Sequence, residues 1–227
     1  TEPWSLMGAG PLRNTDNLYN NQGQVVAISG DAARIAFSSF DVIYRYRRSG
    51  NSWTGDGIYP SSVGKIAFNI DGSTFVHSNG NILYPYLNSV SQGAIHLTGP
   101  ASGIGLSNTG DILITGDSGF GSPVGYVYLR TAGVWALQQT LTPSVFVGGY
   151  IDSVAMSGNG LYLAISSSTD NGGVGATWIY NWTGATWNEQ QKIVVASSSL
   201  AMNIAGDTIV IGGSAGAGKI NVYKRSG

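Results

Sequence analysis

The chain of 227 residues contains no cysteine, which excludes disulfide bonds and metal sites built from thiolates. Charged residues make up only 10% of it, against roughly 25% in ordinary soluble domains. The net charge of −1 provides no general attraction to nucleic acid or to an anionic membrane. Apolar runs long enough for a transmembrane helix are also missing. We therefore expect neither a nucleic-acid partner nor membrane insertion.

Polarity comes instead from glycine, with 34 residues, and from serine, threonine and asparagine. This composition is typical of secreted, cell-surface or virion-surface β proteins, so we expect an extracellular or surface location. Helices are not expected, because no window combines a 3.6-residue apolar period with capping residues. The only histidines, His77 and His96, are interpreted as structural residues rather than metal ligands. We expect no metal and no cofactor.

Five segments share one pattern: a small residue between two apolar residues, then a polar turn and a second apolar run. They cover residues 26–31, 66–72, 104–110, 154–160 and 200–206. Their small residues stand at positions 27, 67, 105, 155 and 201, which gives steps of 40, 38, 50 and 46 residues. This is the period of a four-stranded propeller blade.

Each repeat continues with an aromatic third strand and an outer fourth strand. The fourth strand begins at Trp53, Trp135 or Trp187, and residues 94–97 serve in the second repeat. Joined tail to head, residues 219–227 and 1–8 resemble the internal run 41–53, with Trp4 in the place of Trp53. The pattern predicts an all-β fold, a five-bladed β-propeller whose last blade is closed by the N-terminal strand. The single domain, 1–227, has blades at about 24–60, 63–97, 102–142, 151–195, and 199–227 completed by 1–12.

The repeat resembles FG-GAP-type repeats, which build the integrin alpha-subunit propeller. Residues 26–31 with 44–53, 126–139 and 176–191 carry the resemblance. It implies a propeller fold and a binding role. Integrin-like propellers have more blades, and they carry calcium loops of the form DxDxDG. The turns here are too short to offer three oxygen side chains at alternate positions, so no calcium site is expected.

Three aspartates, Asp41, Asp117 and Asp170, fall in the loops between the second and third strands of blades one, three and four. Such loops cluster on one face of a propeller, where ligands commonly bind. The aspartates are candidates for a polar rim that binds sugar hydroxyls or a partner protein. The alternative is that they form ordinary Asx turns.

Two further groups are candidate contacts. Trp178 and Trp182 lie outside the repeat pattern and are predicted to be exposed, whereas the repeated tryptophans pack between blades. Arg45, Arg47 and Lys224 form a candidate basic patch for a sialylated or sulfated glycan, since arginine matches carboxylate and sulfate geometry. The alternative for this patch is a solvated outward face.

Glycosidase chemistry needs two carboxylates, and the positions leading into the inner strands offer only Asp152. We therefore expect a non-enzymatic recognition or structural module of a cell or virion surface. It would bind a glycan or a surface protein through one propeller face. A carbohydrate-active enzyme and a purely structural surface component remain the alternatives.

Overall fold

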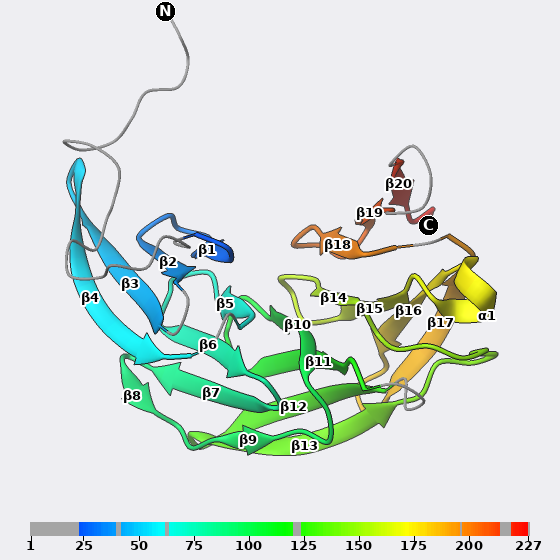
Figure 1. Cartoon of the computed structure of the whole chain (residues 1–227), viewed down its shortest axis with the longest axis horizontal. Helices are drawn as coiled ribbons and strands as arrows, with labels where there is room; N and C mark the ends of the chain where they lie inside the picture. Colours follow the sequence, from blue (N-terminus) through cyan, green and yellow to red (C-terminus); the bar gives the residue numbers. More distant parts are fainter. Residues whose placement is uncertain are drawn as a thin grey trace, which may run out of the picture.

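The computed structural model describes residues 23–39, 42–61, 64–119, 124–195, 197–213 and 219–226. In this part of the chain, 20 strands form five antiparallel sheets that follow one another along the sequence (Figure 1). Within each sheet, strands consecutive in the sequence are neighbours, except that β9 of the second sheet pairs with β7 and not with β8. The structure therefore confirms the all-β prediction.

The first three sheets contain thirteen strands. They are β1 (Val26–Ile28), β2 (Arg34–Ser38), β3 (Val42–Ser49) and β4 (Ser52–Pro60); β5 (Ile66–Phe68), β6 (Thr74–Asn79), β7 (Ile82–Leu87), β8 (Val90–Ser91) and β9 (Ile95–His96); and β10 (Ala101–Leu106), β11 (Ile112–Asp117), β12 (Gly125–Thr131) and β13 (Val134–Leu141). The short strands β8 and β9 both pair with β7. They share the place that one outer strand takes in the first and third sheets.

The last two sheets differ in strand number. They are β14 (Ser153–Met156), β15 (Tyr162–Ser167), β16 (Ala176–Trp182) and β17 (Trp187–Ile193); and β18 (Ser199–Met202), β19 (Thr208–Gly212) and β20 (Ile220–Lys224). A single helical turn, α1 (Asp170–Gly173), which the sequence did not predict, joins β15 to β16. The fifth sheet has three described strands, and the predicted fourth, within residues 1–12, lies outside the described residues.

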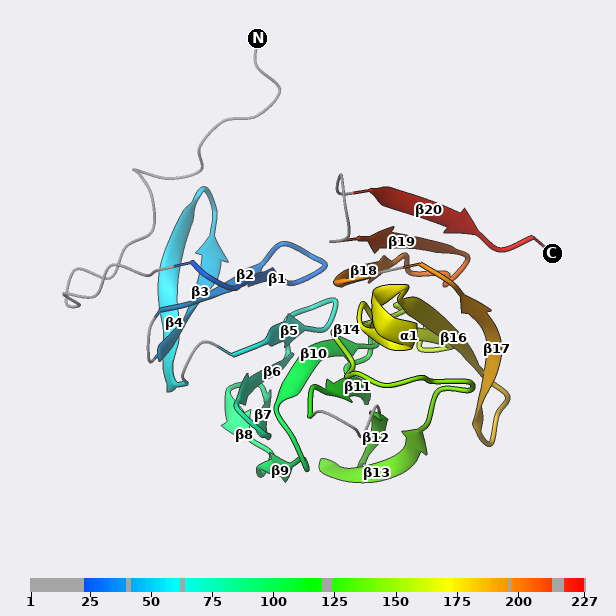
Figure 2. The ribbon, with the colours of Figure 1, turned by 45° about the vertical axis from the view of Figure 1, so that its right-hand side comes forward.

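The first strands of successive sheets lie side by side near the middle of the molecule, and the fourth strands lie outside (Figure 2). Backbone hydrogen bonds also link the turns that follow the first strands. The amide of Asp31 donates to Ile70, at 2.8 Å, and that of Asn108 donates to Gly158, at 2.7 Å. The amide of Asn159 donates to Ile204 at 2.9 Å. These bonds fix how each sheet is rotated against the next.

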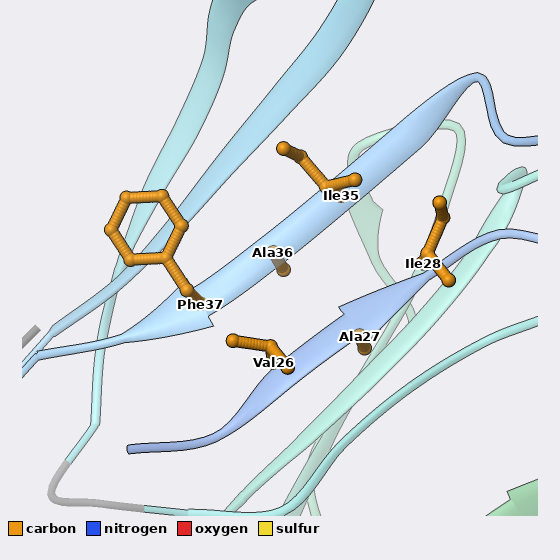
Figure 3. A pocket seen from close by; sticks show the side chains of 6 residues that line it. All are labelled: Val26, Ala27, Ile28, Ile35, Ala36 and Phe37. Carbon is orange, nitrogen blue, oxygen red and sulfur yellow. The ribbon is translucent and has the colours of Figure 1, made fainter. Parts of the chain in front are cut away.

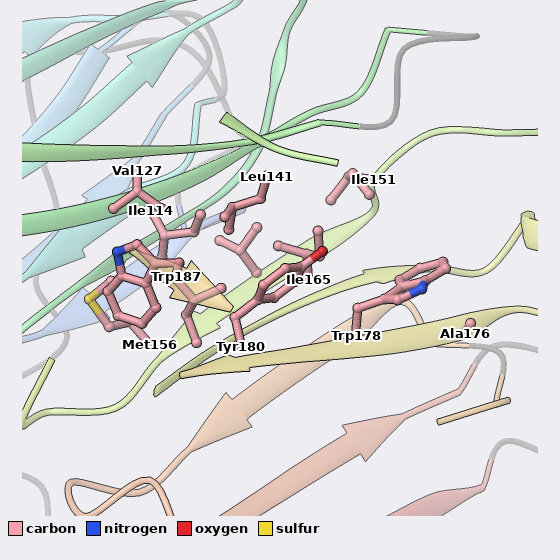
Figure 4. Close-up of a cluster of buried hydrophobic side chains, with 12 residues drawn as sticks. Ile114, Val127, Leu141, Ile151, Met156, Ile165, Ala176, Trp178, Tyr180 and Trp187 are labelled. Atoms are coloured by element: carbon pink, nitrogen blue, oxygen red, sulfur yellow. The ribbon is translucent and has the colours of Figure 1, made fainter. Parts of the chain in front are cut away.

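Apolar clusters fill the spaces between successive sheets. In the largest, Val127 and Leu141 of the third sheet meet Met156, Tyr180 and Trp187 of the fourth (Figure 4). The alternation of side chains along each strand places one set of residues toward the preceding sheet and the other set toward the following sheet. The core is therefore a series of layers between sheets.

Apolar side chains remain exposed at the two ends of this series. Val26 is 70% exposed and Ile28 is 60% exposed on the first sheet, where they line a hollow of about 310 Å³ (Figure 3). Ile220 is 74% exposed and Val222 is 66% exposed on the fifth sheet. The blade count and the closure of the ring stay predictions.

Candidate functional site

The connection between the third and fourth sheets forms a loop of residues 143–150, which we call the rim loop. Its backbone is fixed at Ser144, whose amide donates to Glu189 Oε2 at 2.9 Å and whose hydroxyl donates to Glu189 Oε1 at 2.5 Å. The carbonyl of Ser144 accepts a hydrogen bond from the Trp178 indole at 2.9 Å. Strands β16 and β17 therefore supply the anchors of the loop.

Val145 adopts a backbone conformation that is rare for its residue type. Its φ is +49°, in the left-handed region, which a β-branched residue disfavours. Its carbonyl accepts a hydrogen bond from Lys192 Nζ at 2.8 Å. The Val145 side chain is nevertheless 77% exposed, and that of Val147 is 55% exposed. The anchors thus hold two apolar side chains in water.

Asp170, the first residue of α1, holds the other half of the rim loop. One carboxylate oxygen accepts from the Val147 amide at 2.7 Å, and the other pairs with Lys192 Nζ at 2.8 Å. The Val147 carbonyl in turn accepts from the Asn171 amide at 3.0 Å. Asp170 is only 1% exposed, so its carboxylate stabilises the loop rather than facing a ligand.

Trp178 is fully buried beneath the rim loop, so the prediction that it is an exposed contact is wrong. Its ring packs against Phe146, with centroids 5.7 Å apart, and Lys192 Nζ lies 4.9 Å from its centroid. Trp182 is half-buried and packs against Trp187 at 5.6 Å. Both side chains are on the face of β16 that meets the third sheet, with Trp178 inside the apolar cluster and Trp182 packed against it.

Asp117, the second predicted rim aspartate, is buried like Asp170 and does not form a binding rim with it. Asp117 is 1% exposed, and its carboxylate accepts from the Thr98 hydroxyl at 2.5 Å and the Gly119 amide at 2.6 Å. These bonds tie the loop after β11 to the connection between the second and third sheets. Asp41 lies outside the described residues.

The predicted basic patch is also not assembled as expected. Arg45 is 2% exposed, pairs with Asp56 at 3.0 Å and donates to the Ser89 hydroxyl at 2.6 Å. Its guanidinium therefore belongs to the interface between the first and second sheets, which corrects both the candidate glycan contact and its alternative, a solvated outward face, at Arg45. Arg47 and Lys224 are exposed, on β3 and β20 at opposite ends of the series of sheets (Figure 1).

A polar groove of about 650 Å³ runs between β13 and β17. Its lining includes Gln139, Asn188, Glu189 and Gln190. Tyr180 lies beside Glu189 at 3.3 Å, and burial, reinforced by that carboxylate, raises the pKa of its hydroxyl. This groove offers amide and carboxylate groups but little exposed apolar surface.

Sequence reasoning missed the rim loop, although one signal pointed to it. The step of 50 residues between the third and fourth repeats is the longest, and it contains the run Pro143 to Gly149. Lys192 and Glu189 were missed because they contact the rim loop and α1, which are distant from them in the sequence. An unusually long step with apolar residues inside it is the only sequence-level sign of such a loop.

The remaining described acidic groups have partners within the chain. Asp152 accepts a hydrogen bond from the Ser168 amide, and Asp111 pairs with Arg130 at 2.7 Å. Across the described ranges, no three His, Asp or Glu side chains lie close enough together to hold a metal ion. No helix in the described part of the chain has the length and apolar character needed to span a bilayer.

No protein-family model matches this sequence, and no curated protein matches it. Among solved structures, it is similar to the β-propeller domain of Cps50 (Swd1) from Myceliophteria thermophila, with 11% identity and a TM-score of 0.64. That match covers 86% of this chain and 67% of the other. A functionally unknown protein from Desulfotomaculum acetoxidans DSM 771 matches with 13% identity and a TM-score of 0.70, covering 92% of this chain and 67% of the other. The fold is that of a β-propeller.

Proposed function

We propose that this β-propeller is a non-enzymatic recognition module that binds a protein through its rim loop. The conformation of Val145 carries the proposal. A strained backbone persists only where the surrounding structure enforces it, and here the enforced conformation exposes an apolar side chain. Pre-ordering a loop before binding reduces the entropy cost of association.

The chemistry of the loop favours a protein over a glycan. Val145 and Val147 offer methyl groups but no hydrogen-bonding side chain, and the nearby carboxylates of Asp170 and Glu189 are occupied by the loop itself. A partner with an apolar pocket would remove these two side chains from water. Each valine that becomes fully buried would contribute about 1.5 kcal/mol or more.

A glycan is the second candidate, and the polar groove between β13 and β17 favours it. Asn188 and Gln190 are exposed there and could bond sugar hydroxyls. The groove lacks an exposed aromatic face for a sugar ring, because its tryptophan, Trp187, is 3% exposed. The rim loop therefore remains the primary site, and surface location remains our expectation for the module.

Site-specific photo-crosslinking tests the proposal. A photo-reactive phenylalanine analogue replaces Val147 in the full chain, and the matched control places it at Val134, which is 66% exposed on β13. We expect a defined protein to be crosslinked, in extracts of the source, through position 147 and not through position 134. Equal crosslinking from both positions would contradict the proposal, and a specific hit on a glycan array would favour the groove instead.

A further inference from the structure

The fourth sheet shows how an outer strand that begins with a tryptophan is held against the preceding sheet. Trp187 begins β17 and fills the space between the third and fourth sheets (Figure 4). Its backbone amide donates to the Gln139 side chain at 2.8 Å, and its carbonyl accepts from the same amide group at 2.9 Å. Its indole donates to Gln138 at 3.3 Å. Two glutamines of one sheet thus clamp the outer strand of the next.

The same two glutamines recur one sheet further on. In the third sheet Gln139 pairs with Val127, and in the fourth sheet Gln191 pairs with Ile179. In both sheets the register of the strand pair shifts directly after this pair. Gln190 and Gln191 therefore hold the positions of Gln138 and Gln139. Within the described residues, the side-chain amide of Gln191 has no hydrogen-bond partner.

A pocket of about 530 Å³ lies next to these glutamines, between the fourth and fifth sheets. Five of its lining residues are the register equivalents of five residues in the apolar cluster that contains Trp187. The equivalent pairs are Ile179 and Val127, Ile193 and Leu141, Met202 and Met156, Ile209 and Leu163, and Tyr223 and Tyr180. The pocket therefore has the lining of a tryptophan site.

β20 also presents a pairing edge on its outer side. The first, third and fourth sheets each have four strands in sequence order, whereas β20 has only β19 as a described neighbour. An unpaired strand edge offers a row of backbone donors and acceptors that favour another strand. A strand that pairs with β20 would pass directly beside the pocket.

We infer that the N-terminal segment of this same chain occupies the site, with the Trp4 side chain in the pocket. Of the six tryptophans, Trp53, Trp135 and Trp187 already stand at or next to the start of outer strands, and two others lie within β16. Trp4 is the remaining one. In the fourth sheet, Trp187 of β17 lies opposite Trp182 of β16, and the next residue, Asn188, lies opposite Asn181. If the N-terminal segment pairs with β20 in the same register, Trp4 lies opposite Arg225 and Ser5 lies opposite Lys224.

Disulfide trapping tests this register, and because the chain has no native cysteine, only the introduced cysteines can form the disulfide. The full chain carries Ser5→Cys with Lys224→Cys, or Ser5→Cys with Val222→Cys as the matched control. Directly opposed residues have Cα atoms about 4.5–5.5 Å apart, within disulfide range, whereas the control pair would lie about 7–8 Å apart. We expect a disulfide within the monomer for the first pair, formed at least about tenfold faster than in the control.

A disulfide between two chains, or equal trapping of both pairs, would overturn the assignment, as would no trapping at all. Hydrogen exchange of residues 219–226 gives a second readout in the full chain without cysteines. Trp4→Ala and Gln191→Ala should each speed exchange there, and Gln92→Ala, whose amide bonds only Val90 two residues away, should not. Unchanged exchange in both test variants would contradict the docking of Trp4.

Discussion

His77 is buried among aromatic rings on β6, 1% exposed and stacked on Tyr84 with ring centroids 5.1 Å apart. Burial lowers the pKa of its imidazole from 6.5 to about 4, because the charged form loses its hydration. Between these values the unfolded chain binds more protons than the folded one. The free energy of unfolding should therefore fall as the pH is lowered from 6.5 toward 4, by about 2 kcal/mol at pH 5.

Urea denaturation at pH 7.5 and pH 5 measures this loss. His77→Phe should remove most of the difference, since phenylalanine fits the aromatic cluster without titrating. His96→Gln is the matched control, because His96 is exposed on β9 and should leave the difference unchanged. A full pH effect in the His77→Phe variant would show that other groups cause it.

Asp170 is the buried partner of Lys192 and of the Val147 amide. Asp170→Asn leaves the lysine without its counter-charge, so the free energy of unfolding should drop by about 2 kcal/mol, less than for a fully buried pair because Lys192 is partly exposed. Asp111→Asn is the control: its carboxylate is 47% exposed, so its loss should cost less than about 1 kcal/mol. Equal losses in the two variants, by chemical denaturation, would contradict the structural role of Asp170.

Asp170 lies between a second and a third strand, as the sequence predicted, whereas Asp117 is the last residue of β11 rather than a loop residue. The sequence did not indicate the direction of either carboxylate. An aspartate in a glycine-rich loop can bind its own backbone or face solvent, and only three-dimensional contacts decide between these. Trp178 shows the same limit. Its absence from the repeat pattern suggested exposure, yet its strand position points it into the largest apolar cluster.

At the scale of structural elements, the rim loop stores backbone strain at Val145. Val145→Gly removes the Cβ that disfavours the left-handed conformation, so the free energy of unfolding should rise by about 1 kcal/mol. Val147→Gly is the control and should lower it slightly, because glycine gains entropy in the unfolded chain without relieving strain. Thermal denaturation of both variants checks this, and a destabilised Val145→Gly variant would count against strain in the loop.

Gln139 joins the third sheet to the first residue of β17 through two hydrogen bonds. Gln139→Ala should lower the free energy of unfolding by about 1–2 kcal/mol and speed hydrogen exchange in β17. Gln92→Ala, which removes a bond within its own turn, should do neither. Unchanged exchange in β17 would mean that the clamp does not hold the strand.

The strands themselves followed from the repeat, since the apolar runs and the tryptophans marked where each one lies. The register shifts in the outer strands could not be predicted from the repeat. The register of the outer strands shifts beside Asp56, Gln138 and Gln190. An extra residue in one strand re-aims a side chain, and it leaves no mark in a two-residue alternation. These positions make the cross-sheet contacts of Asp56 with Arg45 and of Gln138 with Trp187.

At the scale of the whole molecule, five similar sheets pack in series, and binding is assigned to one long connection between two of them. The apolar side chains packed between the sheets keep this scaffold stiff, because a close-packed interior has low compressibility. The all-β architecture was predictable from the sequence, because the same local strand pattern recurs along the chain. The surface that we propose for binding was not, because it lies in the connection that departs from the repeat.

The affinity of the protein partner trapped through position 147 tests the central claim most directly. Titration of that purified partner into the wild-type chain and into the Val145→Ser, Val147→Ser double variant compares binding with and without the exposed methyl groups. The account predicts affinity weakened by at least about tenfold in the double variant and unchanged in Val134→Ser. Equal affinity for the wild-type chain and the double variant would contradict recognition through the rim loop.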